Sequence, residues 1–310
     1  MSKILKGLST PVVAIIAVLI IIIAILGVYA AMESHQKTTV VTSTYTTTTT
    51  YTTTYTTPVP QTANISYPFH HFVKISNIDY AGNNSVEIYF ISWYGCLDGA
   101  TNSWALYMVL SHYGTLNVSP NYSDYKPQPL TPTKKIMGMV PGLIFNSFKP
   151  NSTILFHPIY LIGKFYPNKT MTFINGTLVN YTKINVVEFE LHELQKEVPS
   201  WVYNIIYKYE VNMTFEDGKA LVWLKTPAPH IPTTTIITGP NGTWMMIGYP
   251  EYICYGAPGL LAEYAAHYNY SMSVPMNILN DIKTNSLPSN LDFLELFGMY
   301  FQVVIQEAME

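Results

Sequence analysis

The residue in this sequence that is best placed to do chemistry is Cys96. It follows a nearly continuous apolar run over residues 85–93, and a segment with helical spacing of its apolar side chains, residues 100–113, begins just after it. A cysteine at the start of a helix faces the positive end of the helix dipole, which stabilises the reactive thiolate form. The sequence therefore offers Cys96 as a candidate nucleophile.

The sequence lacks the residue patterns of other common kinds of functional site. The histidines are scattered without the ligand spacing of a zinc site, and no Gly-x-Ser-x-Gly, Walker or dinucleotide-binding signature is present. Glu188 and Glu190 alternate as on an element's edge and give no case for an acid–base couple. All sixteen basic residues are lysines, and a net charge of −3 without a basic cluster excludes nucleic-acid binding. We expect no metal and no cofactor.

The elements around Cys96 predict an α/β domain. Residues 70–76 and 85–93 are predicted strands, and residues 233–238 and 243–248 form a hairpin through an Asn-Gly turn. Proline at 199 separates two predicted helices. Residues 119–150 are Pro-rich, so we expect an irregular surface excursion there, with one strand at 143–148. The predicted helices are residues 100–113, 187–197, 199–209, 259–268, 276–283 and 291–308.

This order of elements resembles the thioredoxin fold. The run Ser-Trp-Tyr-Gly-Cys-Leu-Asp-Gly-Ala at 92–100 stands where that superfamily carries its Trp-x-x-Cys-Pro-x-Cys-type motif, and His-Ile-Pro-Thr at 230–233 stands where it carries a cis-proline before a hairpin. More narrowly, the helix over 100–115 and the hairpin over 236–244 resemble the archaeal and bacterial domain-of-unknown-function 929 family. The resemblance implies a mixed sheet with a helical insertion at about 119–228. It also implies an active-site edge formed by Trp93, Tyr94, His230 and Pro232.

The motif departs from the redox pattern of the superfamily. Leu97 replaces the usual proline, and Gly99 stands where a second cysteine would resolve a mixed disulfide, so no dithiol cycle can run within the motif. The thioredoxin arrangement would bring Cys254 near Cys96. A structural Cys96–Cys254 disulfide is the expected state in an oxidising exterior; a labile redox bridge and two free thiols remain alternatives. A soft copper ion at His230 and Cys96 is a further alternative.

The N-terminus predicts a membrane anchor. Residues 11–32 are uncharged and mostly aliphatic, which gives about 33 Å of helix, enough to span the hydrocarbon core of a bilayer. Lys3 and Lys6 precede this segment, so the positive-inside bias leaves residues 1–10 in the cytoplasm and the rest outside. A cleaved secretory signal is the alternative. The Lys-Gly-Leu-Ser-Thr run at 6–10 also resembles a class III, prepilin-type signal, which would be cut after Gly7.

Residues 33–63 predict a stalk, and the rest of the chain predicts a glycosylated exterior. Fourteen of the twenty residues 38–57 are threonine, a composition typical of an O-glycosylated spacer or a bare linker. Charged residues make up only 11% of the chain, against about 25% in an average soluble domain. Residues 64–310 carry Asn-x-Ser/Thr sequons beginning at Asn64, Asn83, Asn117, Asn121, Asn151, Asn168, Asn175, Asn180, Asn212, Asn241 and Asn269.

These features together predict a single-pass, cell-surface glycoprotein with its thioredoxin-like domain outside the cell. The expected role is binding, with surface-layer or other extracellular proteins as partners. The alternative is an extracytoplasmic thiol–disulfide oxidoreductase acting through Cys96. A pilin-like assembly subunit, suggested by the leader alone, is disfavoured by the size of residues 64–310.

Overall fold

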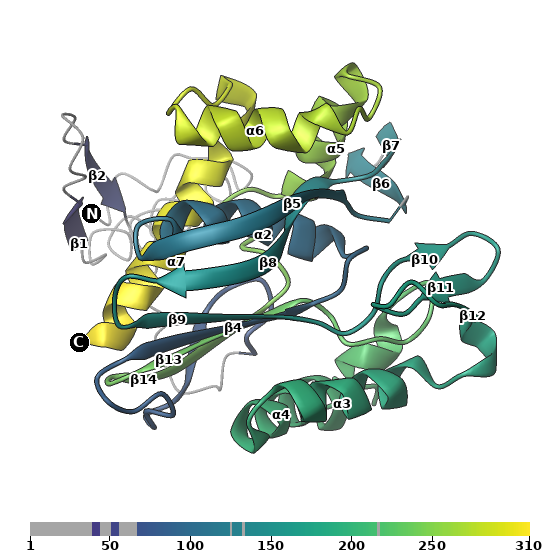
Figure 1. The fold of residues 1–310 in the computed structure, drawn as a ribbon, viewed down its shortest axis with the longest axis horizontal. Coiled ribbons are helices and arrows are strands. Elements are labelled where there is room, and N and C mark those ends of the chain that lie inside the picture. Colours follow the sequence, from purple (N-terminus) through teal and green to yellow (C-terminus); the bar gives the residue numbers. More distant parts are fainter. Residues whose placement is uncertain (1–38, 44–50, 56–66, 125, 132–133, 216–217) are drawn as a thin grey trace, which may run out of the picture. The chain divides into compact units, whose positions relative to one another are not determined.

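The computed structural model describes residues 39–43, 51–55, 67–124, 126–131, 134–215 and 218–310 (Figure 1). The chain divides into two units, Met1–Ile65 and Ser66–Glu310. In the first unit, β1 (Thr39–Ser43) pairs antiparallel with β2 (Tyr51–Tyr55), so two segments of the predicted stalk form a hairpin. The predicted membrane helix at 11–32, the cleavage point at Gly7 and the sequon at Asn64 lie outside the described residues. None of the helices within the described ranges has the length and apolar character needed to cross a bilayer.

The second unit is built on a mixed five-stranded sheet with the order β3-β14-β13-β4-β9. Only β4 and β9 are parallel, and the other neighbouring strands pair antiparallel. β13 and β14 are buried at every position because helices cover both faces of the sheet. The predicted mixed-sheet α/β class is thereby confirmed. The strands are β3 (Val73–Ser76), β4 (Val86–Ser92), β9 (Ile154–Tyr160), β13 (Thr234–Gly239) and β14 (Gly242–Ile247).

Two helical layers enclose this sheet (Figure 1). One layer contains α2 (Leu97–Leu110), α5 (Ala257–His267), α6 (Ser273–Lys283) and α7 (Phe293–Met309). The other contains α3 (Val186–Glu197), α4 (Ser200–Ile206) and the π-helix η3 (Tyr207–Asn212). Successive residues of β4 serve opposite layers, as the alternation of a strand requires: Phe90 packs in the core beside α2 and α7, and Ile91 in the core beside α3 and α4.

The segment predicted to be irregular is largely a β-ribbon. β5 (Gly114–Tyr122) pairs antiparallel with β8 (Pro141–Pro150), and β6 (Lys126–Thr131) pairs with β7 (Lys134–Gly138). Each of these strands has a single partner, so one side of each lacks ladder bonds, and a proline without an N–H is tolerated there. The prolines therefore misled the prediction. β9, which lies inside the range expected as an insertion, forms one edge of the central sheet.

A small three-stranded sheet follows β9 at the end of the central sheet that carries Cys96. It comprises β10 (Phe165–Tyr166), β11 (Thr170–Thr172) and β12 (Leu178–Asn180), and the short helix η2 (Tyr181–Lys183) leads from it to α3. Apolar side chains of this sheet and Cys96 belong to one buried cluster. The remaining short helices are η4 (Leu221–Leu224) and η5 (Ser289–Leu291).

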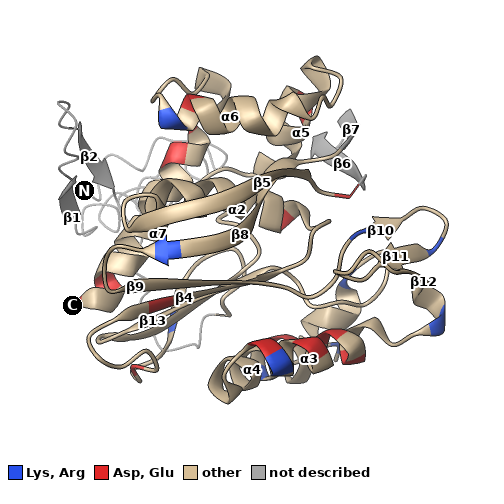
Figure 2. Cartoon of the chain, in the orientation of Figure 1, with Lys and Arg blue, Asp and Glu red and all other residues tan. Residues whose placement is uncertain are grey.

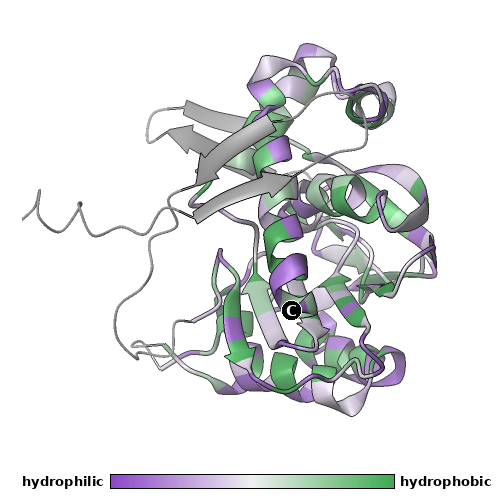
Figure 3. Cartoon of the chain, turned by 90° about the vertical axis from the view of Figure 1, so that its left-hand side faces the viewer, coloured by the Kyte–Doolittle hydropathy of each residue, from purple (hydrophilic) through white to green (hydrophobic). Residues whose placement is uncertain are grey.

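Charge and hydropathy follow these layers. Acidic and basic residues lie on the helices and loops, with several on α3, while the strands of the central sheet carry few (Figure 2). The final helix, α7, alternates hydrophobic and hydrophilic residues along its length (Figure 3). Its buried residues recur at helical spacing, among them Phe297, Phe301 and Ile305, which gives α7 one face to pack on the sheet layer.

Candidate functional site

The thiol of Cys96 lies at the start of α2, as the sequence predicts. Cys96 is the N-cap residue, and its carbonyl accepts the first helical hydrogen bond from the amide of Ala100 at 2.9 Å. Its Sγ accepts a hydrogen bond from Thr233 Oγ1 at 2.9 Å, and Thr233 Oγ1 lies 2.8 Å from Ser92 Oγ. The Thr233 hydroxyl thus holds the thiol, and Ser92 holds that hydroxyl in turn.

Aromatic side chains cover this thiol. Cys96 is 6% exposed, and Trp93 beside it is 2% exposed. The Trp93 ring meets the rings of Phe165 and His230 edge-on, with centroids 5.2 and 5.1 Å away. Phe165 belongs to β10, so the small sheet after β9 closes over the start of α2. Little of Cys96 is therefore open to a dissolved disulfide or peptide in this arrangement.

Asp124 fixes the turn before Cys96. Its amide donates to the Gly95 carbonyl at 2.8 Å, and its Oδ2 accepts from the amide of Phe165 at 2.9 Å. A Cβ on Gly95 would lie 2.0 Å from Asp124 Oδ1, so this close approach requires glycine. Lys164 Nζ donates to the Tyr122 carbonyl at 2.7 Å; burial lowers the pKa of Lys164, while the Asp124 charge raises it. Asp124 therefore links the turn before Cys96 to β10, which packs over that turn.

Gly99 occupies a crowded position, where the thioredoxin pattern has its second cysteine. A Cβ there would lie 2.2 Å from Ser92 Oγ and 3.0 Å from Thr233 Oγ1. The hydrogen-bonded hydroxyls of Ser92 and Thr233 therefore fill the space that a second cysteine would need.

The predicted active-site edge converges but is closed. Trp93, His230 and Pro232 are buried, while Tyr94 is partly exposed and packs against Tyr160 with ring centroids 5.0 Å apart. His230 Nδ1 lies 2.8 Å from the Ala228 carbonyl. The one cis peptide bond in the described residues precedes Pro227, whereas the resemblance implied one at Pro232.

The predicted Cys96–Cys254 disulfide is absent from the structure, in which neither cysteine is disulfide-bonded. Cys96 belongs to the cluster beneath the small sheet, whereas Cys254 packs at the margin of the core around α2 and α7. The two thiols therefore lie among different sets of neighbours. Burial raises the pKa of Cys254, which makes it a poor nucleophile.

The alternative of a copper site finds no support in the arrangement of ligands. Across the described part of the chain, no group of three or more His, Cys, Asp or Glu side chains is placed to hold a metal ion. His230 contacts aromatic rings and a backbone carbonyl, as a packed core histidine does.

Two buried carboxyl groups were not among the predicted site residues, because the sequence analysis set Glu190 aside and did not name Glu210. Glu190 Oε2 accepts from the amide of Ile231 at 2.6 Å, and Glu210 Oε1 accepts from Thr234 Oγ1 at 2.7 Å. A signal for Glu190 was present, because it falls on the apolar face of its helix between Val187 and Leu194. Glu210 gave no such signal, because the π-helix that turns it inward breaks the α-helical period.

The comparison with protein families agrees with the resemblance seen in the sequence. The profile of a family described as "Domain of unknown function (DUF929)" matches residues 71–305. The chain belongs to the DUF929 family. No curated protein and no solved structure matches it. The family description assigns no activity, so function has to be argued from the site itself.

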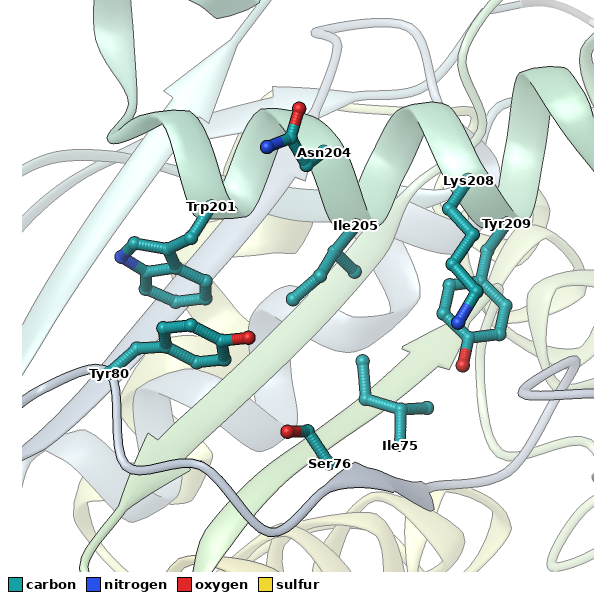
Figure 4. Close-up of a pocket in the computed structure, with 8 residues that line it drawn as sticks. All are labelled: Ile75, Ser76, Tyr80, Trp201, Asn204, Ile205, Lys208 and Tyr209. Carbon is teal, nitrogen blue, oxygen red and sulfur yellow. The ribbon is translucent and has the colours of Figure 1, made fainter.

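The DUF929 domain also has a surface groove away from Cys96, between the loop after β3 and helix α4 (Figure 4). Tyr80 and Trp201 stack at its one end with ring centroids 4.5 Å apart, and Lys208 Nζ lies 4.8 Å above the Tyr209 ring at the other. Ile75 and Ile205 project into the space between them. The groove has a volume of about 450 Å³, the size of a small-molecule site. Its chemistry suits a ligand with an apolar body and an acidic group.

Proposed function

We propose that this DUF929 protein is a membrane-anchored cell-surface glycoprotein whose thioredoxin-like domain binds a ligand or partner and does not exchange disulfides. The apolar segment at 11–32 supports the anchor, and the absence of arginine with few charged residues supports a glycan-covered exterior. The groove beside Trp201 offers one candidate surface for this binding.

The topology supports the thioredoxin-like part of the proposal. The strand β4 leads into a helix that begins at a cysteine, the next sheet strand in the chain, β9, lies parallel to it, and an antiparallel hairpin, β13–β14, lies on its other side. The helices after the hairpin return to the same face as α2. This is the arrangement that the motif at 92–100 implies.

The observation that carries the proposal is the state of Cys96. Disulfide exchange requires a thiolate that a substrate sulfur can reach. Cys96 is 6% exposed beneath Phe165 and Trp93, and a glycine fills the resolving position. Thr233 donates a hydrogen bond that would favour a thiolate, which is the feature an oxidoreductase would use. The covering sheet withholds that thiol from substrates.

Sequon positions support the glycoprotein part. Eight of the sequon asparagines are exposed, namely Asn83, Asn117, Asn151, Asn168, Asn175, Asn212, Asn241 and Asn269. Most of them lie in loops and turns, while Asn117 lies within β5 and Asn212 ends η3. A sugar-covered surface of this kind provides solubility without charge.

Turnover of a disulfide substrate tests the proposal. Residues 64–310 of the wild type and of Cys96→Ser would be assayed for glutathione-dependent reduction of a fluorescent peptide disulfide. We expect both rates to equal the uncatalysed background. A wild-type rate at least tenfold above background that disappears in Cys96→Ser would establish the oxidoreductase function instead.

A further inference from the structure

Glu190 and Glu210 place two carboxyl groups in the core on the α3 side of the central sheet. Glu190 comes from α3 and Glu210 from η3, and both side chains are 0% exposed. One oxygen of each is bound by the chain segment that enters β13, at Ile231 and Thr234. The other oxygens, Oε1 of Glu190 and Oε2 of Glu210, are buried without a hydrogen-bond partner.

The charged and titratable groups around this pair do not neutralise it. Lys225 acts on Glu210 electrostatically, but its Nζ lies 5.2 Å above the Phe69 ring, and neither carboxyl has an ion pair in the part of the chain that is described. The Tyr67 hydroxyl donates a hydrogen bond to the Tyr209 carbonyl at 2.6 Å. Thr234 on β13 contributes a neutral hydroxyl.

Two ionised carboxylates buried in such a place would be strongly unfavourable. Removing a charge from water without a partner is costly, and like charges close together cannot both ionise easily. Burial raises the pKa of Glu190 well above its usual range, and the Glu210 charge adds to that effect. Burial likewise raises the pKa of Glu210 to about 8, opposed by the Thr234 hydrogen bond and the Lys225 charge.

We propose that Glu190 and Glu210 each retain a proton at neutral pH, and that these neutral carboxyl groups lock α3 and η3 onto the segment at 230–234 through their hydrogen bonds to Ile231 and Thr234. Deprotonation of either carboxyl breaks its O–H bond, passes the proton to water and leaves a buried negative charge without an ion-pair partner. The segment released is the one whose Thr233 holds Cys96.

The direction of the pH effect follows from proton binding. Each carboxyl keeps its proton in the folded domain above the pH at which it loses it in the unfolded chain, so the folded state binds more protons between those values. Stability is therefore full below about pH 4.5 and is lost as pH rises towards about 8, where Glu210 ionises. For one retained proton, the unfolding equilibrium constant rises up to about tenfold per pH unit in this window.

Infrared spectroscopy tests the proton directly. Spectra of residues 64–310 at pH 7 should contain the carbonyl-stretch band of a buried protonated carboxylic acid. The band should disappear in the double variant Glu190→Gln/Glu210→Gln and persist in Glu188→Gln, which changes an exposed glutamate on the same helix. A wild-type spectrum without this band, or a band that survives in the double variant, would overturn the proposal.

Hydrogen exchange tests the lock. Between pH 6 and pH 9, exchange protection of the peptide spanning 228–236, corrected for intrinsic rates, should fall by at least tenfold in the wild type and in Glu188→Gln. In Glu210→Gln, where a neutral amide replaces the carboxyl, it should change by less than threefold. Equal losses in all three proteins, or no loss in any, would show that the pair does not control this segment. Neither readout depends on whether the domain binds a ligand.

Discussion

The thiol of Cys96 is hydrogen-bonded to a hydroxyl group and is not paired with a second sulfur. Ser92 and Thr233 occupy the space next to Gly99, and their contact with each other at 2.8 Å and with Sγ at 2.9 Å forms a continuous hydrogen-bonded chain. Buried hydroxyls are costly unless they are bonded, so these three residues depend on one another. The packing of these hydroxyls therefore accounts for the glycine that stands where the redox motif has its second cysteine.

Crowding at position 99 can be measured. Gly99→Ala should destabilise the domain by about 1–3 kcal/mol, because its Cβ would fall 2.2 Å from Ser92 Oγ and overpack the site. The matched control is Gly298→Ala in α7, where the nearest atom is an ordinary 3.5 Å contact with Met108. There, helix propensity should stabilise by about 0.5–1 kcal/mol. Urea unfolding of the two variants would show the opposite signs, and a neutral or stabilising Gly99→Ala would refute the crowding.

The hydroxyl chain makes a second residue-level prediction. Thr233→Val should cost about 1–3 kcal/mol, because it removes the donor to Cys96 and leaves Ser92 without its partner. Two residues along β13, Thr235 has a buried Oγ1 with no hydrogen-bond partner. Thr235→Val should therefore be neutral or stabilising. Thermal unfolding compares them, and equal losses in both variants would mean that the Thr233 hydroxyl contributes nothing specific.

At the scale of elements, the small sheet β10–β12 decides whether Cys96 can react. Phe165→Ala removes the ring that packs on Trp93 and should raise the alkylation rate of Cys96 at least tenfold, at a cost of about 3–5 kcal/mol in stability. Tyr166→Ala, at the exposed neighbouring position, should leave the rate unchanged. Circular dichroism under the labelling conditions checks that both variants are folded. Unchanged labelling in a folded Phe165→Ala would mean that β10 is not the cover.

Elements with strong local signals were predictable from the sequence, and those set by tertiary contacts were not. The apolar run into Cys96, the Asn-Gly hairpin and the break at Pro199 are each local, and β4, the β13–β14 hairpin, α3 and α4 follow them. The strand predicted at 143–148 lies within β8, but its partner β5 was missed because tolerance of the prolines in this ribbon depends on each strand having one partner. The packing of β10 over Trp93 was not predicted because no local sequence pattern indicates it.

At the site, the position of the reactive residue could be predicted from the sequence, but the side chains that surround it could not. The position of Cys96 at a helix start followed from the pattern around it. Its burial, and the separation of Cys254 into another cluster, depend on chain segments far apart in sequence. Glu190 was set aside because its alternation with Glu188 was typical of an element's edge; its burial is visible only once Ile231 is placed against the same core.

For the whole molecule, the proposed glycan coat predicts a specific pattern of occupancy. Peptide mapping of the protein purified from its native host should find sugars on the exposed asparagines, such as Asn83 and Asn151. Asn121 should be bare, because its side-chain amide donates to the Tyr94 carbonyl at 2.7 Å in a partly buried position. An unglycosylated protein, or full occupancy at Asn121 with empty exposed sites, would contradict the coat as drawn.

The central claim is that Cys96 is a packed core thiol in a binding domain. Its most direct test is mass spectrometry of the folded wild-type domain after brief alkylation with iodoacetamide, with the unfolded protein as reference. The account predicts that Cys96 stays unmodified in the folded domain while the unfolded protein labels at both Cys96 and Cys254. Labelling of Cys96 in the folded domain at a rate near that of the unfolded chain would contradict the claim and point back to thiol–disulfide chemistry.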